Sequence, residues 1–193
     1  SVQESFSKPD EYHNVNVKGT ENILKLAKEF EFKIVYASSS SVYGNPSSIP
    51  INENMDKKPI NPYAQTKLDD EILAEKYSNQ GVKVIGLRYF NIFGPRQDPK
   101  GAYAAVIPKF IDLMRQAKQP TINGDGEFSR DFTYIDNVMQ ANINACLVND
   151  SYFGNPINVG CGDRISVNGL AVIIKDVLES DLEPLYEPIR KGD

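Results

Sequence analysis

Apolar and polar residues follow two different periods along the chain, and each period predicts a different kind of element. Between residues 8 and 30 the apolar side chains recur every three or four positions, which places them on one face of a helix. Residues 33–40 and 82–90 are instead nearly continuous apolar runs, "KIVYASSS" and "VKVIGLRYF". Such runs are typical of strands that are buried on both faces of a parallel sheet. The pattern therefore predicts a helix followed by strands of a buried sheet.

Capping and turn residues predict the elements between and after these strands. Asn61 is a favourable N-cap and Pro62 suits the first helical position, so a helix should run from there to about Asn79, with Gly81 ending it. The stretch 44–61 is rich in Pro, Asn and Ser and is predicted to be a loop. Strands alternating with helices predict a doubly wound α/β fold. Further helices are expected near 103–117, 136–148 and 166–180, and further short strands in "PTINGDGE", "PINVG" and "EPLYEPI".

Composition narrows the class of protein. The 193 residues contain 40% hydrophobic and 24% charged residues, as expected for a globular domain. The net charge of -5 argues against a nucleic-acid binder, which needs a basic face. Two cysteines, Cys146 and Cys161, make neither a disulfide framework nor a zinc cluster, so a cytoplasmic location and no metal site are expected. No apolar run approaches transmembrane length, so no membrane partner is expected.

Candidate chemistry gathers where two predicted strands end. In doubly wound sheets ligands bind beyond the carboxyl ends of the strands. Residues 38–41, all serine, end one strand, and Asn91 follows the other. Tyr63 and Lys67 lie on the helix between these strands, and their four-residue spacing puts both on one helix face. A nearby ammonium favours the phenolate and lowers the tyrosine pKa, so Tyr63 is a candidate general base.

Five motifs in a fixed order carry a family resemblance. They are "YASSSSVYG", "NPYAQTK", "LRYFNIFGP", "RDFTYIDNV" and "NVGCG", and they cover nearly the whole chain. In this order they resemble the extended short-chain dehydrogenase/reductase family of NAD-dependent epimerases and dehydratases. The resemblance implies NAD as cofactor and a partial Rossmann-type doubly wound parallel sheet with a smaller α/β substrate-binding portion.

The same resemblance implies a division of the chain into cofactor-binding and substrate-binding segments. Residues 1–93 correspond to the remainder of the NAD-binding domain, and 131–165 return to it. Residues 94–130 and 166–193 correspond to the substrate-binding portion. The family's glycine-rich loop has no counterpart here, so the chain is interpreted as an internal fragment that is expected to bind NAD weakly and to be inactive alone.

Individual roles follow from the matching motif positions. The resemblance implies that Tyr63 is the catalytic base, Lys67 its partner and Ser39 the aligning hydroxyl. The cofactor-binding positions that it implies are Val15, Asn16, Ser39, Tyr63, Lys67 and Phe90. The substrate-binding positions that it implies are Ser1, Ser39, Ser40, Tyr63, Asn91, Gln97, Ala105, Val106, Lys109, Asn123, Arg130 and Arg190.

The residues after Ser39 discriminate between reactions. Related dehydratases carry acidic residues there, whereas Ser40 and Ser41 cannot ionise at a useful pH, and the decarboxylating relatives are disfavoured for the same reason. The chain is therefore similar to NAD-dependent UDP-sugar 4-epimerases, which act through a 4-keto intermediate. The segment 94–110 resembles epimerases of UDP-N-acetylglucosamine, UDP-N-acetylgalactosamine or their uronic acids.

Two alternatives stay open at this point. The substrate can instead be UDP-glucuronate or UDP-glucose, since the "ASSSSVYG" pattern is shared with UDP-glucuronate 4-epimerases. The chain can also be a sugar-nucleotide binding module without turnover, which the missing glycine-rich loop favours. The family resemblance further implies a homodimer for the full-length enzyme and a role in polysaccharide biosynthesis.

Overall fold

The computed structural model describes residues 2–100 and 104–189 and divides the chain into two compact units. Unit 1 comprises Ser1–Phe90 and Asp136–Val159, and unit 2 comprises Asn91–Ile135 and Gly160–Asp193. The chain therefore passes from unit 1 to unit 2 and back before it ends in unit 2. Whether these units serve the cofactor and the substrate, as the predicted division has it, stays a prediction. In the described part of the chain, no helix combines the length and the apolar character that crossing a membrane requires.

Unit 1 is built around a three-stranded parallel sheet in the order β1-β2-β7. Its strands are β1 (Ile34–Ser39), β2 (Val84–Tyr89) and β7 (Ile157–Val159). Register pairs Ala37 with Leu87 and Tyr89 with Val159, so the carboxyl ends of the three strands lie at one edge of the sheet. The predicted runs 33–40 and 82–90 are confirmed as strands.

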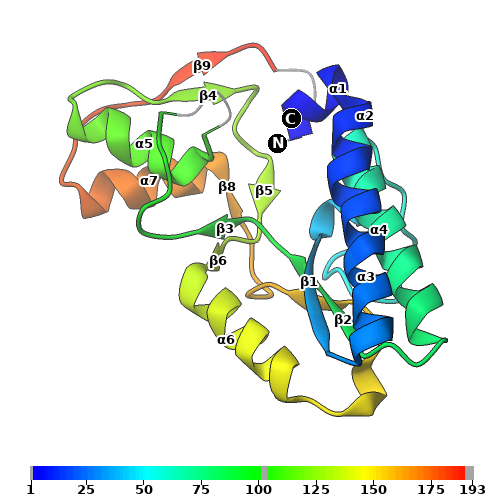
Figure 1. Cartoon of the computed structure of the whole chain (residues 1–193). Coiled ribbons are helices and arrows are strands. Elements are labelled where there is room, and N and C mark those ends of the chain that lie inside the picture. The colour runs from blue at the N-terminus through cyan, green and yellow to red at the C-terminus, as the bar shows by residue number, and fades with distance from the viewer. Residues whose placement is uncertain (1, 101–103, 190–193) are drawn as a thin grey trace. The chain divides into compact units, whose positions relative to one another are not determined.

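Helices cover both faces of this sheet (Figure 1). Helices α3 (Gly19–Phe30) and α4 (Pro62–Ser78) pack on one face, where Leu24, Ala27, Ala74, Tyr77, Val82 and Val84 form a core. Helix α6 (Ile135–Leu147) packs on the other face through Ala145 against Ile85 and Leu87. Because side chains alternate along β2, its two faces meet different helices. The doubly wound α/β architecture is confirmed.

The segment before the sheet is helical for almost its whole length. It contains α1 (Val2–Ser7), α2 (Pro9–Tyr12) and a π-helical turn (His13–Lys18) that runs directly into α3. Helix α4 begins as predicted, because the Asn61 side chain accepts a hydrogen bond from the Ala64 amide at 2.8 Å and Pro62 stands at the first turn. Two short 3-10 turns complete unit 1, at Ser40–Tyr43 and Asp150–Tyr152.

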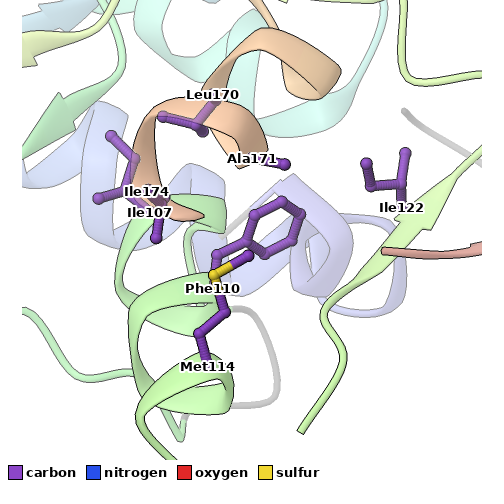
Figure 2. Close-up of a cluster of buried hydrophobic side chains, with 7 residues drawn as sticks. All are labelled: Ile107, Phe110, Met114, Ile122, Leu170, Ala171 and Ile174. Atoms are coloured by element: carbon purple, nitrogen blue, oxygen red, sulfur yellow. The ribbon is translucent and has the colours of Figure 1, made fainter. Parts of the chain in front are cut away.

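Unit 2 is made of short strand pairs and two helices around a core of its own. Helices α5 (Val106–Arg115) and α7 (Val167–Val177) pack together, with Phe110 between them in Figure 2. Strands β3 (Ile92–Phe93) and β6 (Thr133–Tyr134) pair in parallel, as do β4 (Thr121–Asn123) and β9 (Leu185–Glu187). Strands β5 (Ser129–Arg130) and β8 (Ile165–Ser166) pair antiparallel. The buried members of this core are Ile107, Phe110, Met114, Ile122, Leu170, Ala171 and Ile174 (Figure 2).

Candidate active site

Ser39 ends strand β1 and starts the 3-10 turn that follows it. Its hydroxyl oxygen accepts hydrogen bonds from the Ser41 amide at 3.2 Å and from the Ser41 hydroxyl at 2.9 Å. Both bonds use lone pairs of the oxygen, so the hydroxyl keeps its own proton for a further acceptor. Ser40, the neighbouring predicted residue, lies in the turn itself and is half-buried. The strand end therefore offers an oriented hydroxyl donor at Ser39.

Tyr63 lies in the first turn of α4, directly after the Asn61 cap. Its amide donates to the Ser5 hydroxyl at 3.2 Å, and its ring meets that of Tyr12 edge to face, with centroids 6.4 Å apart and planes at 87°. This is a favourable arrangement for an aromatic pair. Residues of α1 and α2 therefore fix the backbone and ring of Tyr63, while the side chain stays partly exposed.

Lys67, one turn further along α4, reaches back to the end of β1. Its Nζ donates to the Ala37 carbonyl oxygen at 3.0 Å and lies 3.3 Å from Asp70 Oδ2. Among residues 2–100 and 104–189, no hydrogen bond joins the Tyr63 hydroxyl to Ser39 or to Lys67. The three predicted catalytic residues are thus placed by α4 and the β1 end, and the electrostatic effect of Lys67 on Tyr63 stays a prediction.

Asp70 is the carboxylate that faces Lys67, and it is only 1% exposed. Burial raises the pKa of the Asp70 carboxyl above its ordinary value, although the Lys67 ammonium opposes this effect. Because the folded-state pKa is higher than the unfolded one, the contribution of Asp70 to stability is fully present below the unfolded pKa and is lost as pH rises through the folded pKa. At neutral pH, above the unfolded pKa, Asp70 therefore contributes less to stability than it does in acid.

We expect Asp70→Asn to raise the free energy of unfolding at about pH 7, with the gain shrinking as pH falls to about 4, near the unfolded pKa of aspartate. Denaturant unfolding of the full-length protein at both pH values measures the difference. Asp69→Asn, at the preceding helix position where the carboxylate accepts from Gln65, controls for the change in net charge. A gain that is equal at both pH values would contradict the assignment.

The remaining predicted cofactor positions lie in unit 1 but differ in exposure. Val15, in the π-helical turn, is 67% exposed. Asn16 Nδ2 donates to the Thr66 hydroxyl at 2.9 Å, which attaches this turn to α4 beside Lys67. Phe90 is buried and packs with the residues of the 3-10 turn after β1. Phe90 therefore packs against the turn that follows β1. Its contact with the cofactor stays a prediction.

Unit 2 contains a pocket of about 300 Å³. Six of the predicted substrate-binding residues line it, although they are spread over 40 positions of the sequence: Asn91, Ala105, Val106, Lys109, Asn123 and Arg130. Four aromatic rings also line the pocket and were missed by the sequence analysis: Phe93, Phe110, Phe128 and Phe132. A signal existed for two of them, because Phe128, Arg130 and Phe132 alternate and so share one side of an extended chain. The pocket combines aromatic walls with two cationic side chains.

The two cations that line this pocket are not paired with a carboxylate in the described part of the chain. Within the described ranges neither Lys109 nor Arg130 has a carboxylate within ion-pair distance. Arg130 Nη1 donates to the Ser129 carbonyl oxygen at 3.1 Å, and the other N–H groups of the guanidinium have no acceptor among the described residues. Asn91 Nδ2 donates to the Asp131 carbonyl oxygen at 3.0 Å. Two cations that no carboxylate among the described residues neutralises suit a ligand with anionic groups.

One predicted substrate position in the described part of unit 2 lies outside the lining of this pocket. Gln97 does not line it: its Nε2 donates to the Ile92 carbonyl oxygen at 3.4 Å, and its Oε1 is buried without a partner in the described part of the chain. Ser1 and Arg190 lie outside the described residues, so their roles stay predictions.

Comparison with known proteins agrees with this architecture. Residues 1–160 match the family model described as the NAD dependent epimerase/dehydratase family. A UDP-N-acetylglucosamine 4-epimerase from Methanobrevibacter ruminantium, solved with UDP-N-acetylmuramic acid, is 39% identical with a TM-score of 0.95; the match covers 100% of this chain and 62% of that one. A UDP-glucuronic acid 4-epimerase from Bacillus cereus, solved with UDP-glucuronic acid and NAD, is 30% identical with a TM-score of 0.84; the match covers 94% and 57%.

A further relative is also matched over about three-fifths of its length. The UDP-glucose 4-epimerase of Mycolicibacterium smegmatis is 33% identical over 196 residues, which cover 100% of this chain and 62% of the relative. The chain thus spans about three-fifths of the length of these relatives.

Proposed function

Because the chain belongs to the NAD dependent epimerase/dehydratase family, we propose that the full-length protein inverts C4 of a UDP-sugar, and that an N-acetylated UDP-glucosamine or its uronic acid is the substrate. One observation carries the reaction type: the Ser39 hydroxyl, Tyr63 and Lys67 are fixed at the end of β1 and on α4, while the positions after Ser39 are held by the hydroxyl side chains of Ser40 and Ser41. Hydroxyl groups can align a substrate oxygen, but they cannot act as the carboxylic acid that water elimination needs.

The donor set at Lys67 fits a nicotinamide cofactor. An ammonium has three N–H donors, and two of them are directed to Ala37 and Asp70. The third has no partner in the described part of the chain and is left for a ribose hydroxyl at the half-buried end of β1. When bound there, NAD supplies the oxidation and re-reduction of the sugar carbon.

The protein's own groups handle the proton. Tyr63 takes the proton of the C4 hydroxyl as general base and returns it after the 4-keto sugar has presented its other face. Ser39 donates its free proton to the same sugar oxygen and so fixes its position.

The unit 2 pocket suits the nucleotide part of the substrate. Arg130 and Lys109 provide the positive charge that a pyrophosphate requires, and a planar guanidinium can grip two of its oxygens at once. The ring of Phe128 offers an apolar wall for uracil, and Asn123 lines the same pocket. The segment 94–110, which the sequence relates to epimerases of N-acetylated sugars, contributes part of the pocket lining.

A substrate panel tests the proposal. The full-length protein with NAD should interconvert UDP-N-acetylglucosamine or its uronic acid with the galacto epimer faster than UDP-glucose or UDP-glucuronate. Faster turnover of UDP-glucuronate or UDP-glucose would replace this substrate by the corresponding alternative. Binding of UDP-sugars in calorimetry without any turnover of the panel would instead indicate a non-catalytic binding module.

A further inference from the structure

The interior of unit 1 holds an ion pair on the strand that the sequence pattern presents as apolar. The side chains of Arg88 on β2 and Glu71 on α4 are 2% and 6% exposed. Arg88 Nε donates to Glu71 Oε1 at 2.8 Å, and Nη2 donates to Oε2 at 2.7 Å. Such a two-pronged bond fixes both the distance and the direction between its partners. The pair therefore holds α4 against β2 in one register.

Residues on both sides of Ser39 are attached to this ion pair. Ser38, which precedes it, donates its hydroxyl proton to Glu71 Oε1 at 2.5 Å. Tyr43, which closes the 3-10 turn after it, accepts a hydrogen bond from Arg88 Nη1 at 2.7 Å. The Arg88 guanidinium also lies 5.0 Å from the centre of the Tyr43 ring. The backbone around Ser39 is thus held from both flanks by the same two charged side chains.

The ion pair also acts on the helix that carries the proposed base. Glu71 follows Lys67 by four residues and Tyr63 by eight, which is about 6 Å and about 12 Å along the helix axis at about 1.5 Å per residue. Helix α4 is continuous over Pro62–Ser78, so a displacement at Glu71 is transmitted to both residues. One ion pair therefore connects the strand end of Ser39 with the helix of Tyr63 and Lys67.

Stability alone does not require this arrangement. Replacing a buried ion pair by apolar residues of similar volume is often neutral or stabilising, because removing two charges from water is costly. Apolar contacts are non-directional, so they hold a helix in place less strictly than a two-pronged hydrogen bond does. The distinctive contribution of the pair is therefore directional.

We propose that Glu71 and Arg88 are positioning residues that set where Ser39 lies relative to Tyr63 and Lys67. The proposal rests on the proposed function, because these three residues are the ones assigned to the sugar C4 hydroxyl. Small errors in the position of a catalytic group cost rate without altering the groups that bind substrate. Loss of the pair should therefore lower kcat and leave KM for the UDP-sugar nearly unchanged.

The main test replaces both charges together in the full-length protein. The double variant Glu71→Leu with Arg88→Met leaves no unpaired buried charge and keeps the volume similar. We expect kcat to fall by roughly 10²-fold, the order of loss that misplacement of a catalytic group brings, with KM and the melting temperature close to those of the parent. A double variant with parental kcat would overturn the proposal.

A milder pair of variants covers the case in which the double variant does not fold. Tyr43→Phe removes the hydroxyl that accepts from Arg88, and we expect kcat to fall by roughly tenfold. Tyr89→Phe is its matched control, because it removes a phenolic hydroxyl on the neighbouring strand position that donates to Asn142 Oδ1 at 3.0 Å without touching Arg88. Equal kcat in both variants would count against the positioning role.

Amide hydrogen exchange separates this proposal from the proposed function. If the parent turns over none of the sugars, the function is wrong, but the positioning of the β1 end can still be measured. The amides of Ser41 and Gly44 donate within the turn after Ser39, to the Ser39 hydroxyl and the Ser41 carbonyl oxygen. They should exchange faster in Tyr43→Phe than in Tyr89→Phe or the parent. Equal exchange in all three proteins would refute the proposed link between the ion pair and this turn.

Discussion

Replacing Tyr63 by phenylalanine should lower kcat of the full-length protein for the proposed epimerisation by roughly 10²–10⁴, the usual contribution of a general base. The substitution keeps the ring, and with it the edge-to-face contact with Tyr12, but it removes the phenolic oxygen that we propose as the proton acceptor. KM for the UDP-sugar should change little. The contacts to the nucleotide bind the substrate before the reaction, and the substitution leaves them intact, whereas proton transfer contributes only in the transition state. Steady-state kinetics with the preferred sugar of the panel measures both quantities.

A second tyrosine on the same helix provides the control for this experiment. Tyr77→Phe removes a hydroxyl near the other end of α4, where the ring packs in the core with Leu24 and Ala74. It should retain the kcat of the parent. If Tyr63→Phe melts like the parent and keeps near-parental kcat, Tyr63 is a packing residue of α4 and the proposed base must be sought elsewhere.

Replacing Arg130 by alanine should raise KM for the UDP-sugar by roughly 10- to 100-fold, with a much smaller effect on kcat. The magnitude follows from the about 1.5–3 kcal/mol that a hydrogen bond to a charged group contributes, at about 1.4 kcal/mol for each factor of ten. The guanidinium lines the unit 2 pocket and has no carboxylate partner in the described part of the chain, so its charge is available to a pyrophosphate. Contacts made equally in ground and transition states appear in KM rather than in kcat.

Titration with UDP alone distinguishes loss of nucleotide binding from a general defect. Arg130→Ala should weaken the binding of UDP by the same factor as KM rises, and added salt should reduce the difference because the interaction is electrostatic. Arg115→Ala removes an exposed arginine from the last turn of α5, outside the pocket, and should leave UDP binding unchanged. Equal affinities for UDP in both variants would contradict the assignment of the pyrophosphate to this pocket.

Much of the secondary structure can be predicted from the sequence, because strands and helix caps depend on residues that are close together along the chain. The apolar runs at 33–40 and 82–90 predict two buried strands, and both are present as β1 and β2. The Asn61 cap and the proline after it fix the start of α4 to the residue, since a cap and a first turn are separated by only a few positions. The paired dipeptides of β3, β5, β6 and β8 were not predicted, because two residues are too few to show a period.

In the candidate site, too, some features follow from the sequence and others only from the packing. The order of the motifs and the four-residue spacing of Tyr63 and Lys67 were sufficient to choose the residues at the end of β1 and along α4. Neither the partner that Lys67 takes nor the aromatic wall of the unit 2 pocket could be derived in this way. Lys67 has both a strand carbonyl and a carboxylate within reach, and only packing decides that it contacts both.

The sequence by itself determined the alternation of strands and helices, the capped start of α4 and the set of residues from which a proton-transfer site can be built. Only the tertiary structure decided that Arg88, in the middle of an apolar run, is buried against Glu71, and that Tyr43 meets Asn158 115 positions away. Helix caps and hydrophobic periodicity depend on residues that are only a few positions apart, so the sequence shows them directly. A buried charge instead has to be matched by a partner that the chain brings close only when the sheet and its helices pack, and no local pattern identifies that partner.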